Sequence, residues 1–222
     1  MKNIGRELDL LINYPKANRD LNSRLESKSE ASRAIGRKFG FDYFDGDRNH
    51  GYGGFQYNEK FWTPVIPTLV SAYSLSNQSR VLDVGCAKGF FLFDLQKAIP
   101  GIQVKGIDVS NYAIENAKAE IKNNLEVGTA CKLPYEDNSF DFVISVNTVH
   151  NLNLDECALA LKEIERVSKG NSFITVDAYR NAEEKKRMEA WNLTALTMMS
   201  VDEWKIFFSK VGYSGDFYWF IP

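Results

Sequence analysis

Residues 81–89 read VLDVGCAKG, an apolar run that ends in a turn bracketed by two glycines. Asp83 stands inside the apolar run, two residues before the first glycine. A second apolar run, QVKGIDV at 103–109, contains Asp108, which follows Gly89 by 19 residues. In parallel α/β sheets this separation brings two strand ends together around a nucleoside ribose. The turn therefore predicts a site for an adenosine-containing cofactor.

Short apolar runs alternate with helical patterns from Arg80 onward. This alternation is typical of βαβ units and predicts an α/β fold with a doubly wound, mostly parallel sheet. Strands are expected at 81–85, 104–109, 126–130, 140–147 and 172–179. Helical spacing gives two inward faces, one with Ala113, Ile114, Ala117 and Ile121, the other with Ala158, Leu161, Ile164 and Val167. A last helix is expected between a capping box, Ser200 with Glu203, and Gly212.

The first 79 residues differ from the rest in composition, so we expect a helical and aromatic lid at 1–79 and a cofactor-binding domain at 80–222. A helix is predicted at 29–39, with Ala31, Ala34 and Ile35 inward and Gly40 as its end. Thr63 and Pro64 fit the cap and first turn of another helix. After the last helix only GDFYWFIP remains, enough for one strand. The sheet is therefore expected to have six strands or to be completed by another chain, and both a monomer and a homodimer stay open.

The composition favours a small-molecule partner. The 222 residues carry a net charge of −2 and a pI near 5.8, which argues against nucleic acid. Three cysteines, an odd number, favour reduced thiols, and no apolar stretch approaches the roughly 18 residues of a membrane span. The N-terminus lacks the apolar core of a signal peptide. We therefore expect a soluble, cytoplasmic protein that does not bind membranes.

Two other nucleotide sites fit the turn poorly. A dinucleotide fingerprint aligned on Gly85 places Ala87 at its second glycine and bulky Phe90 at its third, where helix and strand must pack closely. A P-loop needs Gly-Lys followed by a hydroxyl residue, whereas here Lys88 precedes Gly89. These departures disfavour NAD and phosphate transfer.

With Asp83 in the strand, the pattern D-x-G-x-x-x-G resembles motif I of the class I S-adenosylmethionine-dependent methyltransferases. The resemblance continues through GIDVSNYAIENAK at 106–118, which is similar to the ribose-binding segment of that family. It extends through LPYEDNSFDFVISVNTVHNL at 133–152, similar to the LP-[FY]-x-D-x-S-FD segment of small-molecule methyltransferases that include quinone C-methyltransferases. The resemblance implies a Rossmann-like fold that binds S-adenosyl-L-methionine.

The resemblance also implies roles for individual residues. Gly85, Ala87 and Gly89 would let the backbone approach the methionine part of the cofactor, and Asp83 would lie near its amino group. Asp108 would accept both ribose hydroxyls. The family has Gly-Asp-Ala at the adenine site, but this chain has Gly128-Thr129-Ala130, so the adenine contact passes to the Thr129 hydroxyl or the Ala130 backbone. The remaining residues of the implied cofactor site are Cys86, which we assign no chemistry, Val109 and Asn147.

The sequence signals for the methyl-acceptor site are less specific than those for the cofactor site. His150 follows Asn147 at the end of the fourth predicted strand and is the candidate general base; the alternative is a histidine that shapes the pocket or caps the next helix. Asp42, Asp45 and Asp47 could hold a polar substrate or form a solvated face, and they lack a His or Cys at ligand spacing, so no metal is expected. Lys88 is expected to be a solvated first-turn residue, and Phe90 and Phe91 core. The candidate lid and substrate residues are Arg48, Tyr52, Phe55, Tyr57 and Trp62, with a packed entrance hairpin as the alternative.

Together these patterns predict an enzyme that transfers a methyl group to an oxygen, nitrogen or carbon of a small metabolite. Alignment of the reactants is expected to supply most of the catalysis. An NPPY-type sequence at the end of the fourth predicted strand would indicate adenine-N6 methylation of nucleic acids. This chain has SVNTVHNL there, which argues against that activity. A protein acceptor stays open. The rival hypotheses are an enzyme of the same fold with other chemistry, such as a decarboxylase, and a non-catalytic partner subunit.

Overall fold

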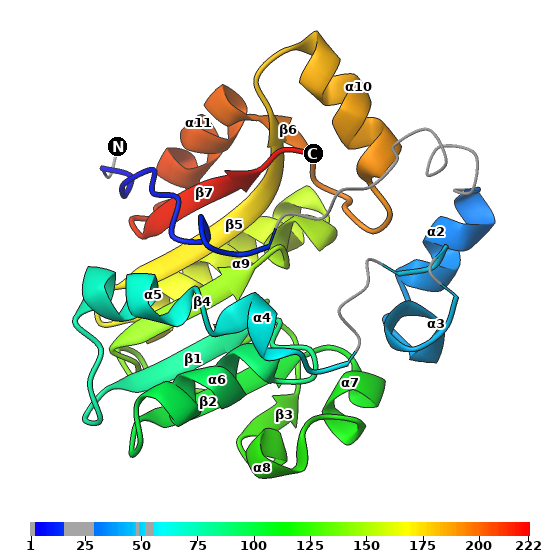
Figure 1. Cartoon of the computed structure of the whole chain (residues 1–222). Helices are drawn as coiled ribbons and strands as arrows, with labels where there is room; N and C mark the ends of the chain where they lie inside the picture. The colour runs from blue at the N-terminus through cyan, green and yellow to red at the C-terminus, as the bar shows by residue number, and fades with distance from the viewer. Residues whose placement is uncertain (1–2, 16–28, 48, 52–55) are drawn as a thin grey trace.

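The computed structural model describes residues 3–15, 29–47, 49–51 and 56–222. At its centre lies a seven-stranded sheet in the order β3-β2-β1-β4-β5, with β6 and β7 both paired to β5 (Figure 1). The strands are β1 (Arg80–Val84), β2 (Gln103–Asp108), β3 (Leu125–Val127), β4 (Phe142–Val146), β5 (Ser172–Tyr179), β6 (Met199–Ser200) and β7 (Asp216–Phe220). Every strand pair in the described part of the chain is parallel. The predicted doubly wound α/β fold is confirmed.

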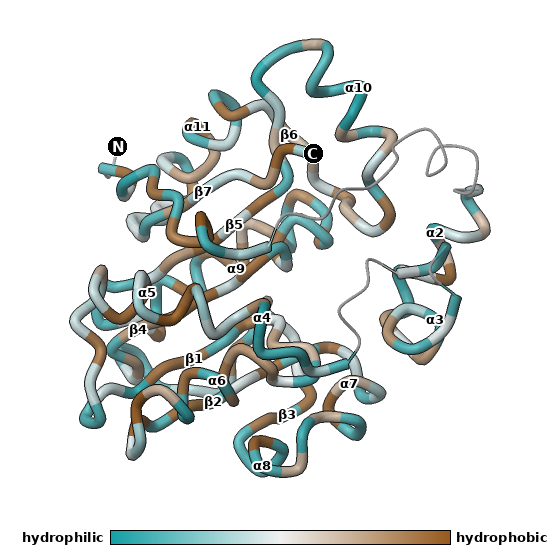
Figure 2. The backbone as a smooth tube through the Cα atoms, in the orientation of Figure 1, coloured by the Kyte–Doolittle hydropathy of each residue, from teal (hydrophilic) through white to brown (hydrophobic). Residues whose placement is uncertain are grey.

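Helices cover both faces of the sheet. One layer contains α5 (Ile66–Tyr73) and α6 (Phe90–Ala98), whose side chains share a core with Val81 and Phe142. The opposite layer contains α9 (Leu154–Val167) and α11 (Val201–Val211), which pack on Leu82 and Val143. Neighbouring strand residues thus point to opposite faces, and Figure 2 shows hydrophobic residues gathered along the central strands between the two layers. The remaining elements are α2 (Glu30–Gly36), α3 (Phe41–Phe44), α4 (Glu59–Trp62), α7 (Asn111–Glu115), α8 (Ala119–Lys122), η1 (Val149–Asn151) and α10 (Ala182–Trp191).

The helix expected around 113–121 is divided into α7 and α8. The Asn116 amide donates to the Tyr112 carbonyl at 2.8 Å, so this side chain ends the first helix locally instead of continuing its ladder. The strand expected at 126–130 is also shorter, because the chain leaves the sheet after Val127. By contrast, the capping box of Ser200 and Glu203 and the left-handed Gly212, with φ 82°, bound α11 as predicted.

Two expectations for the N-terminal region are wrong. In α2 the buried residues are Ser32 and Gly36, while Ala31 and Ala34 are exposed, because Gly36 lies close to the His50 carbonyl and the Leu193 side chain. The helix ends at Gly36, well before Gly40.

Thr63 does not begin a helix either. It forms the C-terminal cap of α4. The N-terminal cap of that helix is Asn58, whose side-chain oxygen accepts the Lys60 N–H at 3.1 Å. The next helix, α5, begins at Ile66 with proline in its first turn. The Asn side chain therefore supplies the cap that we assigned to Thr63.

The N-terminal segment runs along the outer edge of β7 (Figure 1). The Leu8 N–H donates to the Phe217 carbonyl at 3.0 Å, and the Phe217 N–H donates to the Arg6 carbonyl at 3.0 Å. The two-residue β6 makes the sheet seven-stranded, and this segment covers its edge, so the expectation of six strands is wrong. Leu10 and α5 also join the main core, while the boundary at 79/80 stays a prediction.

Among the described residues, no helix has the length and apolar character needed to cross a bilayer.

Candidate active site

A cavity of about 540 Å³ lies at the carboxyl ends of the strands. The strand order reverses between β1 and β4, and ligands of open α/β sheets bind at such a reversal. The volume falls within the range of small-molecule sites. Helices α2 and α3 lie at the strand ends, on the side where α7 and α10 also lie (Figure 1).

The glycine turn after β1 has a backbone that larger residues cannot adopt cheaply. Gly85 has φ 87°, and a Cβ there would lie 2.1 Å from the Thr148 hydroxyl. Gly89 has φ 75° and is the N-terminal cap of α6, while Ala87 itself has φ 49°. The Gly85 and Cys86 N–H groups donate to the Ile107 carbonyl at 2.8 and 3.1 Å, so β2 fixes the turn. Glycine is therefore required at positions 85 and 89 by backbone conformation and close packing, and residues 85–88 of the turn line the cavity.

Asp83 lines the cavity and is only 6% exposed. Its carboxylate has no hydrogen bond or ion pair with another residue in the described part of the chain. Burial, followed by the nearby Asp108 carboxylate, raises the pKa of Asp83 to about 8. A buried acid without a cationic partner fits a ligand that brings its own positive charge.

Asp108 ends β2 and is held by the turn. Its two carboxylate oxygens accept the N–H groups of Ala87 and Ser110, each at 2.8 Å. Burial raises the pKa of Asp108, and these two hydrogen bonds only partly offset it. A carboxylate has about four acceptor positions, so positions remain for two hydroxyl groups from the cavity. The geometry fits the predicted ribose contact.

The predicted adenine-side residues also line the cavity. The Gly128 N–H donates to the Asp108 carbonyl at 2.8 Å, and the Thr129 hydroxyl accepts the Cys131 N–H at 3.2 Å. Thr129 can still donate its own hydroxyl hydrogen. Val109 is 61% exposed, and both Val109 and Ala130 line the cavity. Cys86 is buried, and its thiol pKa is raised by burial and then by Asp83. A thiol with a raised pKa is a poor nucleophile.

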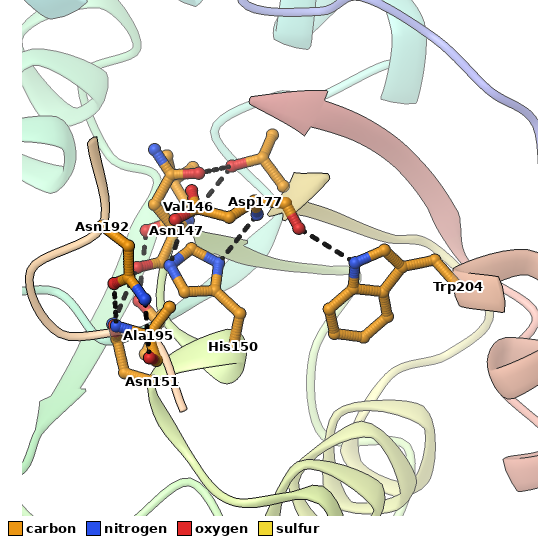
Figure 3. A network of polar contacts seen from close by, with 10 residues as sticks. Val146, Asn147, His150, Asn151, Asp177, Asn192, Ala195 and Trp204 are labelled. Carbon is orange, nitrogen blue, oxygen red and sulfur yellow. Dashed lines mark hydrogen bonds and ion pairs between the residues drawn. The ribbon is translucent and has the colours of Figure 1, made fainter. Parts of the chain in front are cut away.

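Asn147 and His150 follow β4. Asn147 has φ 52°, and its side-chain oxygen accepts the Thr175 hydroxyl at 2.9 Å. His150 is 4% exposed, and its Nδ1 accepts the Asp177 N–H at 3.0 Å (Figure 3). Burial lowers the pKa of His150, against a smaller opposing effect of Asp177, so the ring is neutral and its hydrogen is assigned to Nε2. Its Nε2 atom lies 3.7 Å from the Asp177 Oδ1 atom, and the predicted base role stays a prediction.

The lid residues divide into two groups. Arg48, Tyr52 and Phe55 lie outside the described residues. Tyr57 points to α6, where its hydroxyl donates to Asp94 at 2.6 Å and burial raises its pKa to about 12.

Trp62, in contrast, lines the cavity and packs on Tyr14 and Phe91, with ring centroids 5.0 and 5.1 Å apart. Phe91 is buried as expected, at 3% exposed, and both Phe90 and Phe91 border the cavity.

Lys88 is not solvated. Its side chain is 8% exposed, and its ammonium donates to both oxygens of Asp45 at 2.7 Å. Tyr112 donates to the same carboxylate at 2.6 Å. The pair joins the end of α3 to the glycine turn, which explains why a lysine in this turn is buried.

Several cavity residues escaped the sequence analysis. They are Tyr14, Arg37, Lys38, Phe39, Tyr43, Phe44, Asp177, Trp191 and Phe220. Asp177 could have been found, because it is a carboxylate within an apolar strand, as Asp83 is. The others come from segments without a motif, and only the fold brings them together. Within the described residues, no group of three or more potential ligands forms a metal site.

Comparisons with known proteins show which family this chain resembles. Residues 82–176 match the family described as a methyltransferase domain. Demethylmenaquinone methyltransferase of Staphylococcus aureus is 38% identical over 101 residues, covering 43% of this chain and 41% of that protein. An uncharacterised protein of Haemophilus influenzae is 29% identical over 159 residues, covering 65% of this chain and 62% of that protein. The chain thus matches less than two thirds of the length of these curated relatives.

A solved structure supports the fold. An S-adenosylmethionine-dependent methyltransferase from Methanosarcina mazei superposes with a TM-score of 0.52 at 20% identity, covering 64% of this chain and 82% of that one.

Proposed function

We propose, from the premise that this chain belongs to the class I S-adenosylmethionine-dependent methyltransferases, that it transfers a methyl group to a small molecule. The observation that carries the proposal is the Asp83 carboxylate, buried in the cavity without a partner among the described residues. S-adenosyl-L-methionine carries a cationic amino group that this carboxylate can hold. The cofactor, when bound, supplies an electrophilic methyl group.

The residues of the chain have distinct tasks in this proposal. Asp108 orients the ribose, Thr129 or the Ala130 backbone contacts the adenine, and the Gly85 turn lets the methionine part approach. Asn147 lies where the cofactor and the acceptor meet. The aromatic walls, including Trp62, exclude water, so catalysis comes mainly from alignment of the reactants.

A small acceptor is favoured over a macromolecule by the position of α2 and α3. The Lys88–Asp45 ion pair and the hydrogen bond from the Ser110 hydroxyl to the Phe39 carbonyl fasten these helices to the cofactor side. The resulting cavity suits a compact molecule. A different reaction on the same fold would leave the cofactor site intact but yield no methylated product. A non-catalytic partner subunit would instead be marked by a damaged cofactor site.

The test begins with cofactor binding. S-adenosylhomocysteine at about 100 times its Kd should raise the melting temperature by about 5–10 °C, because it binds only the folded chain. Asp108→Asn should remove most of this shift, whereas Asp42→Asn, on the exposed side of α3, should keep it. Absence of any shift at millimolar ligand would refute the cofactor assignment. Incubation of a metabolite extract with methyl-labelled cofactor should then yield a labelled small molecule.

A further inference from the structure

We infer that the methyl acceptor is an amine, held by the Asp177 carboxylate between the cofactor site and the rings of Phe220 and Trp191. The inference rests on the proposed function, because it names the acceptor class of the same cavity. It assigns Asp177, which carries no motif, to the acceptor side.

The position of Asp177 is set by its main chain. Asp177 lies near the end of β5, and its N–H donates to His150 while its carbonyl accepts the Trp204 indole N–H at 2.9 Å (Figure 3). Its side chain is 5% exposed and belongs to the cavity lining. The neighbouring strand β4 ends at Val146, and Asn147, which follows it, also lines the cavity. The carboxylate is therefore fixed beside the place where a transferred methyl group must arrive.

His150 cannot compete with Asp177 as the proton acceptor in this geometry. Its Nδ1 lone pair accepts the Asp177 N–H, and its Nε2 lies 3.7 Å from the Asp177 Oδ1 atom. The neutral ring thus presents a hydrogen, not a lone pair, toward the carboxylate. We assign His150 as a positioning residue and the Asp177 carboxylate as the group that touches the acceptor.

Two aromatic residues, Phe220 and Trp191, line the same cavity as this carboxylate. Asp177 and Phe220 are direct partners in the β5–β7 ladder, so their side chains point to the same face of the sheet. The ring of Trp191 lies 5.2 Å from that of Phe220, and both rings line the cavity. A carboxylate flanked by aromatic rings favours positive charge, because the ring faces are negative.

Charge separates an amine from the other acceptors. A phenolate or enolate would place a second negative charge beside Asp177, which is costly in a buried site. An alcohol would have to lose its proton during the reaction to become a strong nucleophile. A neutral amine already carries its lone pair, and the positive charge that develops on nitrogen is stabilised by the carboxylate as transfer proceeds.

Methyl transfer to the amine conserves atoms and charge. The acceptor amine donates one N–H to Asp177 and directs its lone pair at the methyl carbon. The nitrogen forms the new N–C bond as the C–S bond breaks, and the sulfur keeps the electron pair of that bond. S-adenosylhomocysteine results with a neutral sulfur, and the positive charge moves to the methylated nitrogen. The ammonium product then passes a proton to Asp177 or leaves as the cation.

The experiment uses the full chain, a metabolite extract and cofactor with a trideuterated methyl group, with products analysed by tandem mass spectrometry. We expect the label on nitrogen, seen as a fragment that keeps the trideuteromethyl group bonded to an amine. Asp177→Asn should lower kcat/KM for that product about 100-fold. The Asp177→Asn variant should show the same melting-temperature shift with S-adenosylhomocysteine as the unmodified chain. The control variant, Asp155→Asn, changes an exposed residue of α9 and should also show that shift.

His150→Gln tests the positioning role. It should reduce kcat with that acceptor by a smaller factor than Asp177→Asn does. The acid limb of the pH profile of kcat should stay in place, whereas loss of a base would remove it. Label on oxygen or carbon, with the cofactor shift intact, would overturn the amine inference and leave methyl transfer standing. Nitrogen labelling that Asp177→Asn does not slow would overturn the assignment of Asp177. Absence of both shift and label would refute the proposed function itself.

Discussion

Asp83 should couple cofactor binding to the release of a proton. Its pKa, raised to about 8 by burial and then by Asp108, leaves the carboxyl largely protonated at pH 6. A cationic amino group binds the ionised form, so binding must release a proton below pH 8. The Kd for S-adenosylhomocysteine should therefore fall by up to about tenfold per pH unit between pH 6 and 8, then level off. Isothermal titration calorimetry in buffers of different ionisation enthalpy measures both the Kd and the proton release.

The matched variant for this prediction is Asp83→Asn, which keeps the size of the side chain. It should bind more weakly and show no proton release linked to this position. A Kd that stays constant from pH 6 to 8 in the unmodified chain would contradict the assigned pKa.

The site residues that could be predicted from sequence are ionisable residues inside apolar strands. Asp83 and Asp108 stand out in sequence because ionisable groups are rare in buried strands, and the cavity contains both. Asp177 has the same signature, but it has no glycine motif next to it. Phe220 and Trp191 look like ordinary core residues in sequence. Sheet pairing places Phe220 beside Asp177 in the β5–β7 ladder, and Trp191, in α10, packs on the Phe220 ring.

At the scale of elements, strong local signals were reliable. The capping box of α11 and the apolar periods of the central strands act within a few residues, so sequence alone placed them. The break between α7 and α8 and the buried face of α2 were missed, because a side-chain hydrogen bond and a close backbone contact override weak periodicity there. Lys88 was misjudged for the same reason: its partner Asp45 is distant in sequence.

The ion pair between Lys88 and Asp45 should fasten α3 to the glycine turn. The two side chains are 8% and 26% exposed, so the pair is largely protected from water. Burial raises the pKa of Asp45, but hydrogen bonds from Lys88 and Tyr112 outweigh it, and the net pKa is lowered. We expect a coupling free energy of about 1–3 kcal/mol between Lys88→Met and Asp45→Asn in a double-mutant cycle measured by urea unfolding.

The control pair is Lys97 with Glu59, which also links α6 to a helix of the N-terminal region. Their atoms are 3.5 Å apart, and the side chains are 60% and 69% exposed. Lys97→Met with Glu59→Gln should couple by less than about 0.5 kcal/mol. Equal coupling in the two cycles would mean that α3 is held by other contacts.

At the scale of the whole molecule, the N-terminal segment binds the end of the chain through contacts with β7. Arg6 and Asp216 are 210 residues apart, yet the Arg6 main-chain N–H and guanidinium donate to the Asp216 carboxylate at 2.7–3.2 Å. Tyr73, in α5, donates to the same carboxylate at 3.0 Å. Neither end of this contact has a motif, so the sequence could not predict which segment covers β7. For that reason, the sequence left completion of the sheet by a second chain open as an alternative.

The closing contact should give the stability of the whole chain a specific acid dependence. Burial raises the pKa of Asp216, but hydrogen bonds from Arg6 and Tyr73 outweigh it, so the folded-state pKa is lowered. The contact therefore stabilises the fold above the ordinary aspartate pKa of about 3.9 and is lost as the pH falls through the lower folded value. Because the Arg6 side chain is 66% exposed, Arg6→Met should cost only about 1 kcal/mol of unfolding free energy at pH 7.

Urea unfolding from pH 7 to pH 3 measures this dependence. The difference between Arg6→Met and the unmodified chain should stay constant from pH 7 to about pH 5 and shrink as Asp216 becomes protonated. Lys210→Met removes an exposed cation at the end of α11 and should change the unfolding free energy by less than about 0.5 kcal/mol throughout. If the Arg6→Met difference persists undiminished at pH 3, the Asp216 carboxylate is not its source, and main-chain pairing with β7 alone would hold the N-terminal segment in place.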